Sequence, residues 1–416
     1  MRNMSIPPPS SAQAVGYLAL VKDNRNFRKI WLADIASGFG DWFTIIASAS
    51  LIGALGSSAT GLGILFILRT LPPFLISPLA GVLADRLNPR SIMVASDLLR
   101  ALAVCALVLV DGPEDFWLVY AITALQAAAS GFFTTARNTV MPEILSSREL
   151  GAGNALSSAS YAMMLAVGAG IGGIFAGKLG LIAAFLVDAL TYVVSAVLVL
   201  AAHAPRQAGQ RTPRTSILAD YADSLRYLRQ QHDIRFLVLQ KGLNALLITG
   251  SLHVLITTIA TQHFPLGQAA SLSIGLLYCA AGVGGGIGPL LARVVSIDHT
   301  RRLRLGLALS YCISAAGLAV AATMGSFWVV AVGLVIRGAG GGILYMFSSH
   351  LLMDILPSEL RGRIFGTEHG LRTLLNAVGI AAGSILIEQG LTPRQLLLLM
   401  ACAALLPFLA WLRRLR

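Results

Sequence analysis

The sequence predicts an all-α membrane protein whose twelve spanning helices form two pseudo-symmetric six-helix bundles. Of its 416 residues, 56% are hydrophobic and only 12% are charged, whereas soluble domains average about 45–50% and about 25%. Apolar runs of about 20 residues, the length that crosses a bilayer, recur from residue 30 to the end of the chain. The halves also repeat weakly, because NFRKIWL at 26–32 resembles DIRFLVL at 233–239 and MPEILSSREL at 141–150 resembles MDILPSEL at 353–360.

Short connections that carry most of the charged residues separate the apolar runs from one another. In chain order they predict spans at 30–54, 60–83, 91–110, 116–136, 152–177, 181–202, 236–261, 270–292, 305–324, 326–350, 364–387 and 395–412.

The longest connection, 203–235, divides six predicted spans from six. It begins with a turn-rich stretch from Pro205 to Pro213 and continues with apolar residues on one helical face, which predicts an amphipathic helix at the membrane interface. A plain soluble linker helix explains the pattern equally well. We therefore expect a cytoplasmic arm (1–29), an N-terminal bundle (30–202), a cytoplasmic linker (203–235) and a C-terminal bundle (236–416).

The Lys and Arg residues indicate the orientation of the chain. Of the 31, 24 fall on one side of the predicted membrane, whereas Lys178 and Arg394 fall on the other and five lie within spans. Because such residues are retained in the cytoplasm, we expect a multi-pass protein of the bacterial inner membrane with both termini cytoplasmic. The net charge of +12 is scattered over short loops, so it reflects topology and not a nucleic-acid partner.

One connection has a recognisable pattern, Gly81-Val-Leu-Ala-Asp85-Arg86-Leu-Asn-Pro-Arg90. Gly81 would allow close helix approach, and Asp85 can accept hydrogen bonds at a helix N-terminus. Arg86 and Arg90 could pair with acids across the seam between the bundles. The alternative is a solvated, positively charged turn. We expect Asp85 to form a latch with the start of the 364–387 span, beside Arg361 and Arg363.

This connection resembles the G-x-L-A-D-R-x-x-x-R loop of the major facilitator superfamily. Neighbouring residues resemble the exporter branch that includes enterobactin exporters and macrolide-efflux proteins: Gly40-Asp41-Trp42, Pro72-Pro73, Pro78-Leu-Ala-Gly81, Arg137, Pro142, Glu143, Leu150 and Asn154. The resemblance implies a secondary transporter that exports a small organic molecule by alternating access, with inward proton movement. It suggests a siderophore as the first cargo candidate and a hydrophobic drug as the second. The sequence shows no ligand spacing for a metal ion, and we expect no cofactor.

The sequence also departs from the family pattern. Gly168-Ala169-Gly170-Ile171-Gly172-Gly173 resembles the G-P-x-x-G-G antiporter motif, but Ala169 replaces the proline. Close helix packing by Gly168, Gly172 and Gly173 is the alternative explanation. The connection after the 270–292 span lacks the latch pattern. Gln126 occupies about the place in the fourth span that Arg337 takes in the tenth.

Ten charged residues lie within the predicted spans: Asp34, Asp41, Asp97, Asp188, Glu368, Arg69, Arg100, Lys241, Arg337 and Arg372. Each costs about 2.5–3.5 kcal/mol at a helix centre, so most must be paired or wet. The i,i+3 and i,i+4 spacings predict the pairs Asp97–Arg100 and Glu368–Arg372.

The remaining intramembrane charges are the site candidates. Asp41 is the first candidate for proton coupling because it lies near the midplane, where burial favours the neutral carboxyl and a nearby arginine favours the charged one. Asp34, on the same face, could pass the proton on, and Asp188 is the reserve candidate. We expect Arg69 and Arg337 to face Asp34, Asp41 or anionic parts of the cargo. The expected charged or polar cavity residues are Arg69, Arg337, Gln126 and Lys241; static buried pairing is the alternative.

Other functions on the same fold stay open at this point. Uptake or lysolipid flipping would use the same twelve spans. A membrane-embedded enzyme would need a catalytic constellation, and the sequence contains no HExxH, no GxSxG and no paired cysteines. We therefore expect a monomeric non-enzyme in the lipid bilayer, whose partners are its small-molecule cargo and protons.

Overall fold

The computed structural model describes residues 16–54, 58–146, 148–203, 226–295 and 300–415. Within these ranges twelve helices are long and apolar enough to cross a membrane, as the sequence predicts. A short helix, α1 (Tyr17–Asp23), precedes them. The spans of the first half are α2 (Arg25–Ala54), α3 (Ala59–Arg86), α4 (Pro89–Ala106), α5 (Phe116–Ile144), α6 (Leu150–Met163) with α7 (Ala169–Leu179), and α8 (Leu181–Ala201). Those of the second half are α10 (His232–Asn244) with α11 (Gly250–Gln262), α12 (Ser271–Val295), α13 (Thr300–Ala322), α14 (Phe327–Ile355), α15 (Ser358–Glu388) and α16 (Pro393–Leu415).

Capping residues explain why several spans begin where they do. The Ser58 hydroxyl accepts from the Gly61 amide at the start of α3, and the Ser326 hydroxyl accepts from the Val329 amide at the start of α14. Asn88 accepts from the Arg90 amide ahead of Pro89, the first residue of α4. These side chains satisfy amides that the helix itself leaves without partners, and proline at the first helical position loses no hydrogen bond.

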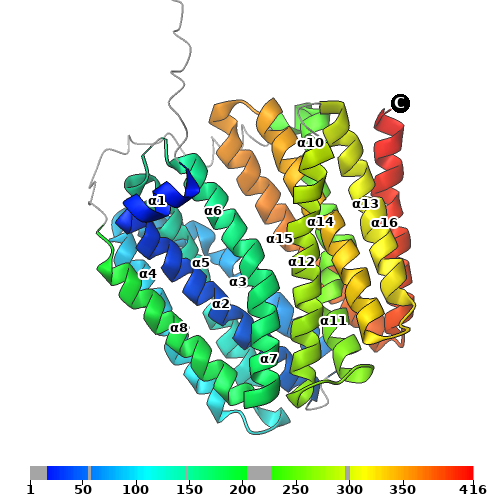
Figure 1. Ribbon diagram of the computed structural model, residues 1–416, viewed down its shortest axis with the longest axis horizontal. Helices are drawn as coiled ribbons and strands as arrows, with labels where there is room; N and C mark the ends of the chain where they lie inside the picture. Colours follow the sequence, from blue (N-terminus) through cyan, green and yellow to red (C-terminus); the bar gives the residue numbers. More distant parts are fainter. Residues whose placement is uncertain (1–15, 55–57, 147, 204–225, 296–299, 416) are drawn as a thin grey trace, which may run out of the picture.

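The two halves lie side by side as separate bundles. Figure 1 shows α2 to α8 on one side of the molecule and α10 to α16 on the other, with α1 and the C-terminus at the same end. In the first half α2 packs on α8 and α3 on α5, and in the second half α14 packs on α12 and α13. The all-α architecture of two six-helix bundles is therefore as predicted.

The closest approaches between the bundles lie away from the end that carries the termini. A Cβ atom built on Gly173 of α7 would lie 2.6 Å from the Cα of Gly275 of α12, so these two backbones touch. By contrast, Cβ atoms built on Gly151, Gly286 and Gly362, all nearer the termini, would meet no described atom within 4 Å. The helices of the two halves lean apart towards this end in Figure 1.

Two spans contain a π-helical turn near their middle. The turn Met164–Gly168 joins α6 to α7, and the turn Ala245–Thr249 joins α10 to α11. Such turns disrupt the regular hydrogen-bond ladder and are frequent at functional sites. The first turn faces the other bundle, since a Cβ atom built on Gly282 of α12 would lie 2.7 Å from the Cα of Ala166. The second turn packs on α15 of its own bundle, and α11, which follows it, packs on α2 and α3.

The largest difference from the predicted spans is at the end of α5. The sequence predicts a span ending at residue 136, but the helix continues to Ile144. Arg137 can lie inside this longer helix because Asp34 and Ser157 satisfy its guanidinium within the bundle. Most of the predicted amphipathic linker helix, up to residue 225, lies outside the described residues.

Candidate functional site

An acid near the centre of α2 joins three other helices of the N-terminal bundle. Asp41 forms an ion pair with Arg69 of α3, at 3.1 Å between Oδ1 and Nη2. Tyr192 of α8 donates its hydroxyl to the same carboxylate at 2.6 Å, and Arg100 of α4 lies 4.0 Å from its other oxygen. The expected contact between Asp41 and Arg69 is present. Two donors and the charge of a second arginine around one carboxylate stabilise its ionised form.

Arg100 anchors the core beneath this cluster. It forms the predicted i,i+3 ion pair with Asp97, and both side chains are buried. Its guanidinium lies over the rings of Tyr192 and Phe133, at 4.4 and 5.0 Å from their centres. These cation–π contacts supplement the ion pair where water is excluded. We therefore assign Asp97 and Arg100 a structural role.

Asp188 of α8 is buried beside this cluster with a different set of partners. It is 0% exposed and accepts hydrogen bonds from the hydroxyls of Thr44 and Thr191. Among the described residues, none of the Lys or Arg side chains forms an ion pair with it. Hydroxyl donors leave a carboxylate charge uncompensated, and a buried charge without a counter-ion is costly.

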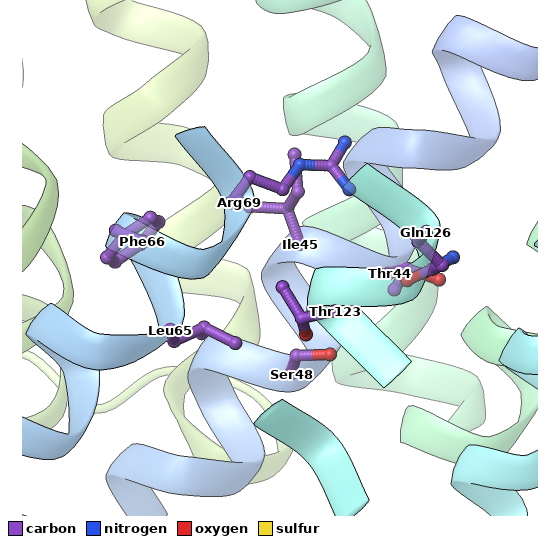
Figure 2. A pocket seen from close by; sticks show the side chains of 8 residues that line it. All are labelled: Thr44, Ile45, Ser48, Leu65, Phe66, Arg69, Thr123 and Gln126. Atoms are coloured by element: carbon purple, nitrogen blue, oxygen red, sulfur yellow. The ribbon is translucent and has the colours of Figure 1, made fainter. Parts of the chain in front are cut away.

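A small pocket lies on the side of Arg69 away from the termini. It has a volume of about 10 Å³ and is lined by Thr44, Ile45, Ser48, Leu65, Phe66, Arg69, Thr123 and Gln126. Figure 2 shows the side chains of Ser48 and Thr123 turned towards the same space, with Arg69 beyond them. A cavity of about this volume holds one water molecule. Gln126, a predicted cavity residue, thus lies in the wall of a water-sized space and 3.5 Å from the hydroxyl of Tyr192.

Asp34 lies nearer the termini on the same helix and pairs with a residue that the sequence placed outside the spans. Its carboxylate lies 3.1 Å from Arg137 of α5, and Arg137 also donates to Ser157 of α6 at 2.9 Å. Of the acids expected to face the arginines, Asp34 thus meets neither Arg69 nor Arg337 in this conformation. Its partner comes from the extended end of α5.

Lys241 and Glu368 form the corresponding ion pair in the C-terminal bundle. Their charged atoms lie 3.0 Å apart, and Lys241 also donates to Ser349 of α14 at 2.8 Å. The predicted Glu368–Arg372 pair is wrong, because Arg372 points to His369, one turn before it, at 3.1 Å. Glu368 thus pairs with a lysine on the neighbouring helix α10 and not with the arginine four residues after it on its own helix.

Arg337 is buried in α14 with a neutral partner. It is 8% exposed and donates to the hydroxyl of Thr249, at the end of the π turn, at 2.7 Å. No acid forms an ion pair with Arg337 in the part of the chain that the structure describes. In this conformation Arg337 faces neither Asp34 nor Asp41, because those acids are held by arginines of their own bundle. The remaining expectation, that it faces anionic parts of the cargo, stays a prediction.

Aromatic residues join the bundles between these charged groups. Trp42 packs on Tyr278 with ring centres 5.5 Å apart, and Phe66 stacks on His253 at 5.2 Å. The hydroxyl of Tyr278 lies 3.1 Å from Nδ1 of His253. The sequence reasoning missed Tyr278 and Tyr192; the latter stands one helical turn after Asp188, a spacing that signals a shared face.

The predicted latch loop is only partly described. The side chain of Asp85 lies outside the described residues, so the latch itself stays a prediction. Arg86 is exposed at the end of α3. A Cβ atom added to Gly81 would have no described atom within 4 Å, so this glycine does not mediate close helix packing here.

Two of the arginines expected to work with Asp85 have other described partners. Arg90 donates to the carbonyls of Val199 and Leu200 at the end of α8, so it does not reach across the seam. Arg361 donates to the carbonyl of Leu356, just before α15. Arg363 lies near the start of the same helix. Helix C-terminal carbonyls attract cations, which explains the position of Arg90.

The glycines of the predicted antiporter-like motif lie against other helices. Gly168 faces Trp42 and Gly172 faces Phe43 of α2, where added Cβ atoms would lie 3.1 and 3.3 Å from the nearest atoms. Together with Gly173 they allow α7 to pack tightly between α2 and α12. The packing explanation of this motif therefore agrees with the structure.

Comparison with protein families gives one match that covers most of the chain. The model described as Major Facilitator Superfamily matches residues 30–384. The chain is 25% identical over 395 residues to the uncharacterized MFS-type transporter YfiS of Bacillus subtilis (strain 168), covering 89% of this chain and 88% of that protein.

Two further relatives have named activities. The multidrug efflux pump Tap of Mycolicibacterium fortuitum is 27% identical over 381 residues, covering 87% of this chain and 89% of Tap. Macrolide efflux protein A of Streptococcus pyogenes is 24% identical over 381 residues, with the same coverage of 87% and 89%.

Solved structures resemble the fold over nearly its whole length. The nucleoside transporter NupG superposes with a TM-score of 0.70 at 13% identity, covering 94% of this chain and 98% of NupG. A bacterial homologue of the iron transporter ferroportin, in an inward-facing state, superposes with a TM-score of 0.71 at 17% identity, covering 94% and 98%. At these identities the likeness concerns the fold.

Proposed function

Because the chain belongs to the Major Facilitator Superfamily, we propose that it is a secondary active transporter that exports a small organic molecule across the bacterial inner membrane. The names of Tap and of macrolide efflux protein A support export. They also favour a hydrophobic drug-like cargo over the siderophore that the sequence pattern suggested first. We propose cytoplasmic termini on the basis of the Lys and Arg distribution.

The observation that carries the proposal is the partial exposure of charged side chains deep in the spans. Asp34, Asp41 and Arg69 are 22, 19 and 24% exposed, although all three lie well inside their helices, and Asp41 and Arg69 lie at least 10 residues from either end. Charges at such depth face a water-filled cavity and not lipid. A wet, charged space between two bundles is what alternating access requires.

The arrangement of the bundles supports a specific state within that cycle. Close contacts such as Gly173 with Gly275 lie away from the termini. With the termini in the cytoplasm, these contacts close the periplasmic side. We therefore assign this conformation to the inward-facing half of the cycle, in which cargo enters from the cytoplasm.

Proton coupling is part of the proposal, with a changed ranking of the acids. Asp41 was the first candidate from the sequence, but its ion pair with Arg69 and its bond from Tyr192 favour the charged form. Among the described residues, Asp188 has hydroxyl donors alone, and it has no exposure, so its neutral form is favoured. We propose that Asp188 carries the proton and that Asp41 receives or supplies it when the cluster rearranges.

The experiment uses inverted membrane vesicles energised with a proton gradient, and it follows ethidium and the macrolide erythromycin. An exporter concentrates either compound inside such vesicles, and a proton uncoupler abolishes the accumulation. Accumulation only in right-side-out vesicles would replace export by uptake. Movement of labelled lysolipid between leaflets, with no accumulation of either compound, would favour the flippase alternative.

A further inference from the structure

The geometry points to an anion-binding site on the C-terminal bundle, centred on Arg337 and Thr249, which receives a carboxylate, phosphate or sulfate group of the cargo. This inference rests on the proposed export function, because it names the class of cargo that the central cavity accepts.

The first observation is a buried cation with unused donors. Arg337 is 8% exposed, its guanidinium donates to the hydroxyl of Thr249 at 2.7 Å, and its Nε–H has no partner among the described residues. In the described part of the chain this guanidinium has no acid in an ion pair. A buried charge without a counter-ion is strongly unfavourable, so a group that brings a negative charge would bind here with a large gain.

The second observation is the hydrogen-bonding state of Thr249. Its oxygen accepts from Arg337 and also from Nδ2 of Asn244 at 3.1 Å. A hydroxyl has two acceptor positions and one donor, so both acceptor positions are filled and the hydrogen is directed elsewhere. Thr249 closes the π turn, in which the chain leaves its regular ladder. Arg337 and Thr249 thus present neighbouring donors without a described acceptor.

The third observation comes from comparing the two bundles. In the N-terminal bundle Arg69, which is 24% exposed, and the buried Arg100 each form an ion pair with an aspartate. Asp41 corresponds to Ile248 at the repeat offset of 207 residues, and Gln126 corresponds to Arg337 at the offset of about 211. The C-terminal bundle therefore has the cation but lacks the acid at the equivalent depth.

Neighbouring charges do not compensate for Arg337. Glu368, the acid of this bundle with a described buried ion pair, is held by Lys241 at 3.0 Å. Arg372 donates to a histidine, so it adds a second positive charge to the same bundle. The wall formed by the C-terminal bundle is therefore positive, whereas the pairs Asp34–Arg137 and Asp41–Arg69 leave the opposite wall nearly neutral.

The position of the site suits a cargo held between the bundles. His253 follows Thr249 by one helical turn and stacks on Phe66 of the other bundle. The charge of Arg337 acts on His253, so the guanidinium lies close to the seam, where the cargo of an alternating-access transporter binds. Its planar fork suits two-oxygen anions, which it can bind through two parallel hydrogen bonds.

The test measures thermal unfolding of the purified full-length protein with benzoate, 1-naphthoate and fluorescein as anionic probes. Rhodamine 123 serves as the matched cation, since it has the same ring system as fluorescein but an esterified carboxyl. We expect saturable stabilisation by at least one anion and a weaker effect of rhodamine 123. Arg337→Gln should abolish the anion effect and should raise the midpoint of the empty protein, because it removes an uncompensated buried charge.

Thr249 provides a matched pair of variants in which Arg337 is unchanged. Thr249→Asp places a carboxylate beside the guanidinium, so the built-in counter-ion should abolish anion binding. Thr249→Asn has nearly the same shape without the charge and should retain binding. Arg394→Gln removes an exposed cation at the start of α16, at the end of the molecule opposite the termini, and should behave like wild type. The two Thr249 variants test whether anions bind beside Arg337 even if the Arg337→Gln protein cannot be purified in folded form.

The inference is overturned if none of the three anions stabilises the wild-type protein, or if Thr249→Asp binds them as well as Thr249→Asn does. It is also overturned if Arg337→Gln lowers the midpoint of the empty protein. Export of ethidium without anion binding would count against this site alone. Arg337-dependent anion binding in a protein that moves nothing across vesicles would count against the export proposal alone.

Discussion

Asp34 and Lys241 occupy equivalent positions in the two halves of the chain, 207 residues apart, and have opposite charges. Each belongs to a triad of one acid, one base and one serine. Asp34 pairs with Arg137, which also bonds Ser157, whereas Lys241 pairs with Glu368 and also bonds Ser349.

The other members of the triads are related in the same way. Ser157 corresponds to Glu368 at an offset of 211 residues, and Arg137 corresponds to Ser348, next to Ser349. The two triads thus share two equivalent positions and differ by one residue at the third, with the signs permuted. Because each triad is neutral within its own bundle, it ties three helices together without requiring a partner across the seam. This arrangement suits bundles that move as rigid bodies.

The first prediction concerns the Lys241–Glu368 pair. Lys241→Gln should destabilise the protein by up to about 3–5 kcal/mol, because it leaves a buried acid unpaired. The double variant Lys241→Gln/Glu368→Gln should recover most of this loss. Denaturant unfolding in detergent measures the wild type, Lys241→Gln, Glu368→Gln and the double variant, which together form a double-mutant cycle. Additive losses would show that the two side chains do not stabilise each other.

The second prediction concerns the closed side of the seam. Gly275→Ala should destabilise the present conformation by about 1–3 kcal/mol, because a Cβ atom there meets the backbone of α7. Gly286→Ala on the same helix is the matched control, since no described atom lies within 4 Å of its added Cβ. Labelling of a cysteine introduced at Gly151 reports opening towards the termini. Equal labelling in both variants would contradict the assignment of this state.

The third prediction concerns the loop after α3. Asp85→Asn should slow transport severalfold without affecting membrane insertion, because it removes the acceptor expected to hold the outward-facing state closed on the cytoplasmic side. Asp354→Asn is the control, since Asp354 is exposed on the predicted cytoplasmic side and contacts His350 at 3.7 Å. Initial transport rates at matched expression measure the effect. Wild-type rates for Asp85→Asn would exclude the latch.

The sequence predicted the fold well because hydropathy and charge vary along the chain in the way that the membrane requires. Depth in the membrane can be counted along a helix, so Asp41 and Arg69 could be matched before their contact was seen. Asp97 and Arg100 could be paired because they share one helix.

Contacts between side chains of neighbouring helices could not be predicted from positions along the chain. Glu368 prefers Lys241 on a neighbouring helix, and Asp34 prefers Arg137, because helix rotation and the true end of α5 decide which side chains meet. The sequence also could not show that Arg337 forms no ion pair with a described acid. Arg337 and Asp41 lie at the same depth, so depth alone suggested that they could meet.

The last prediction separates the two candidate acids for proton coupling. Asp188→Asn should preserve the stability of the protein, because an amide closely resembles the protonated carboxyl that hydroxyl donors and full burial favour. Asp41→Asn should destabilise it, because Arg69 loses its counter-ion. Both variants are reconstituted into proteoliposomes, and ethidium accumulation under an imposed pH gradient is compared with exchange in the absence of a gradient. Asp188→Asn should lose the gradient-driven accumulation and retain exchange, since it can bind cargo but cannot bind or release a proton. Gradient-driven accumulation at the wild-type rate in Asp188→Asn would return the coupling role to Asp41 or Asp34. Loss of exchange as well as accumulation would assign Asp188 to the structure of the cavity and not to the proton pathway.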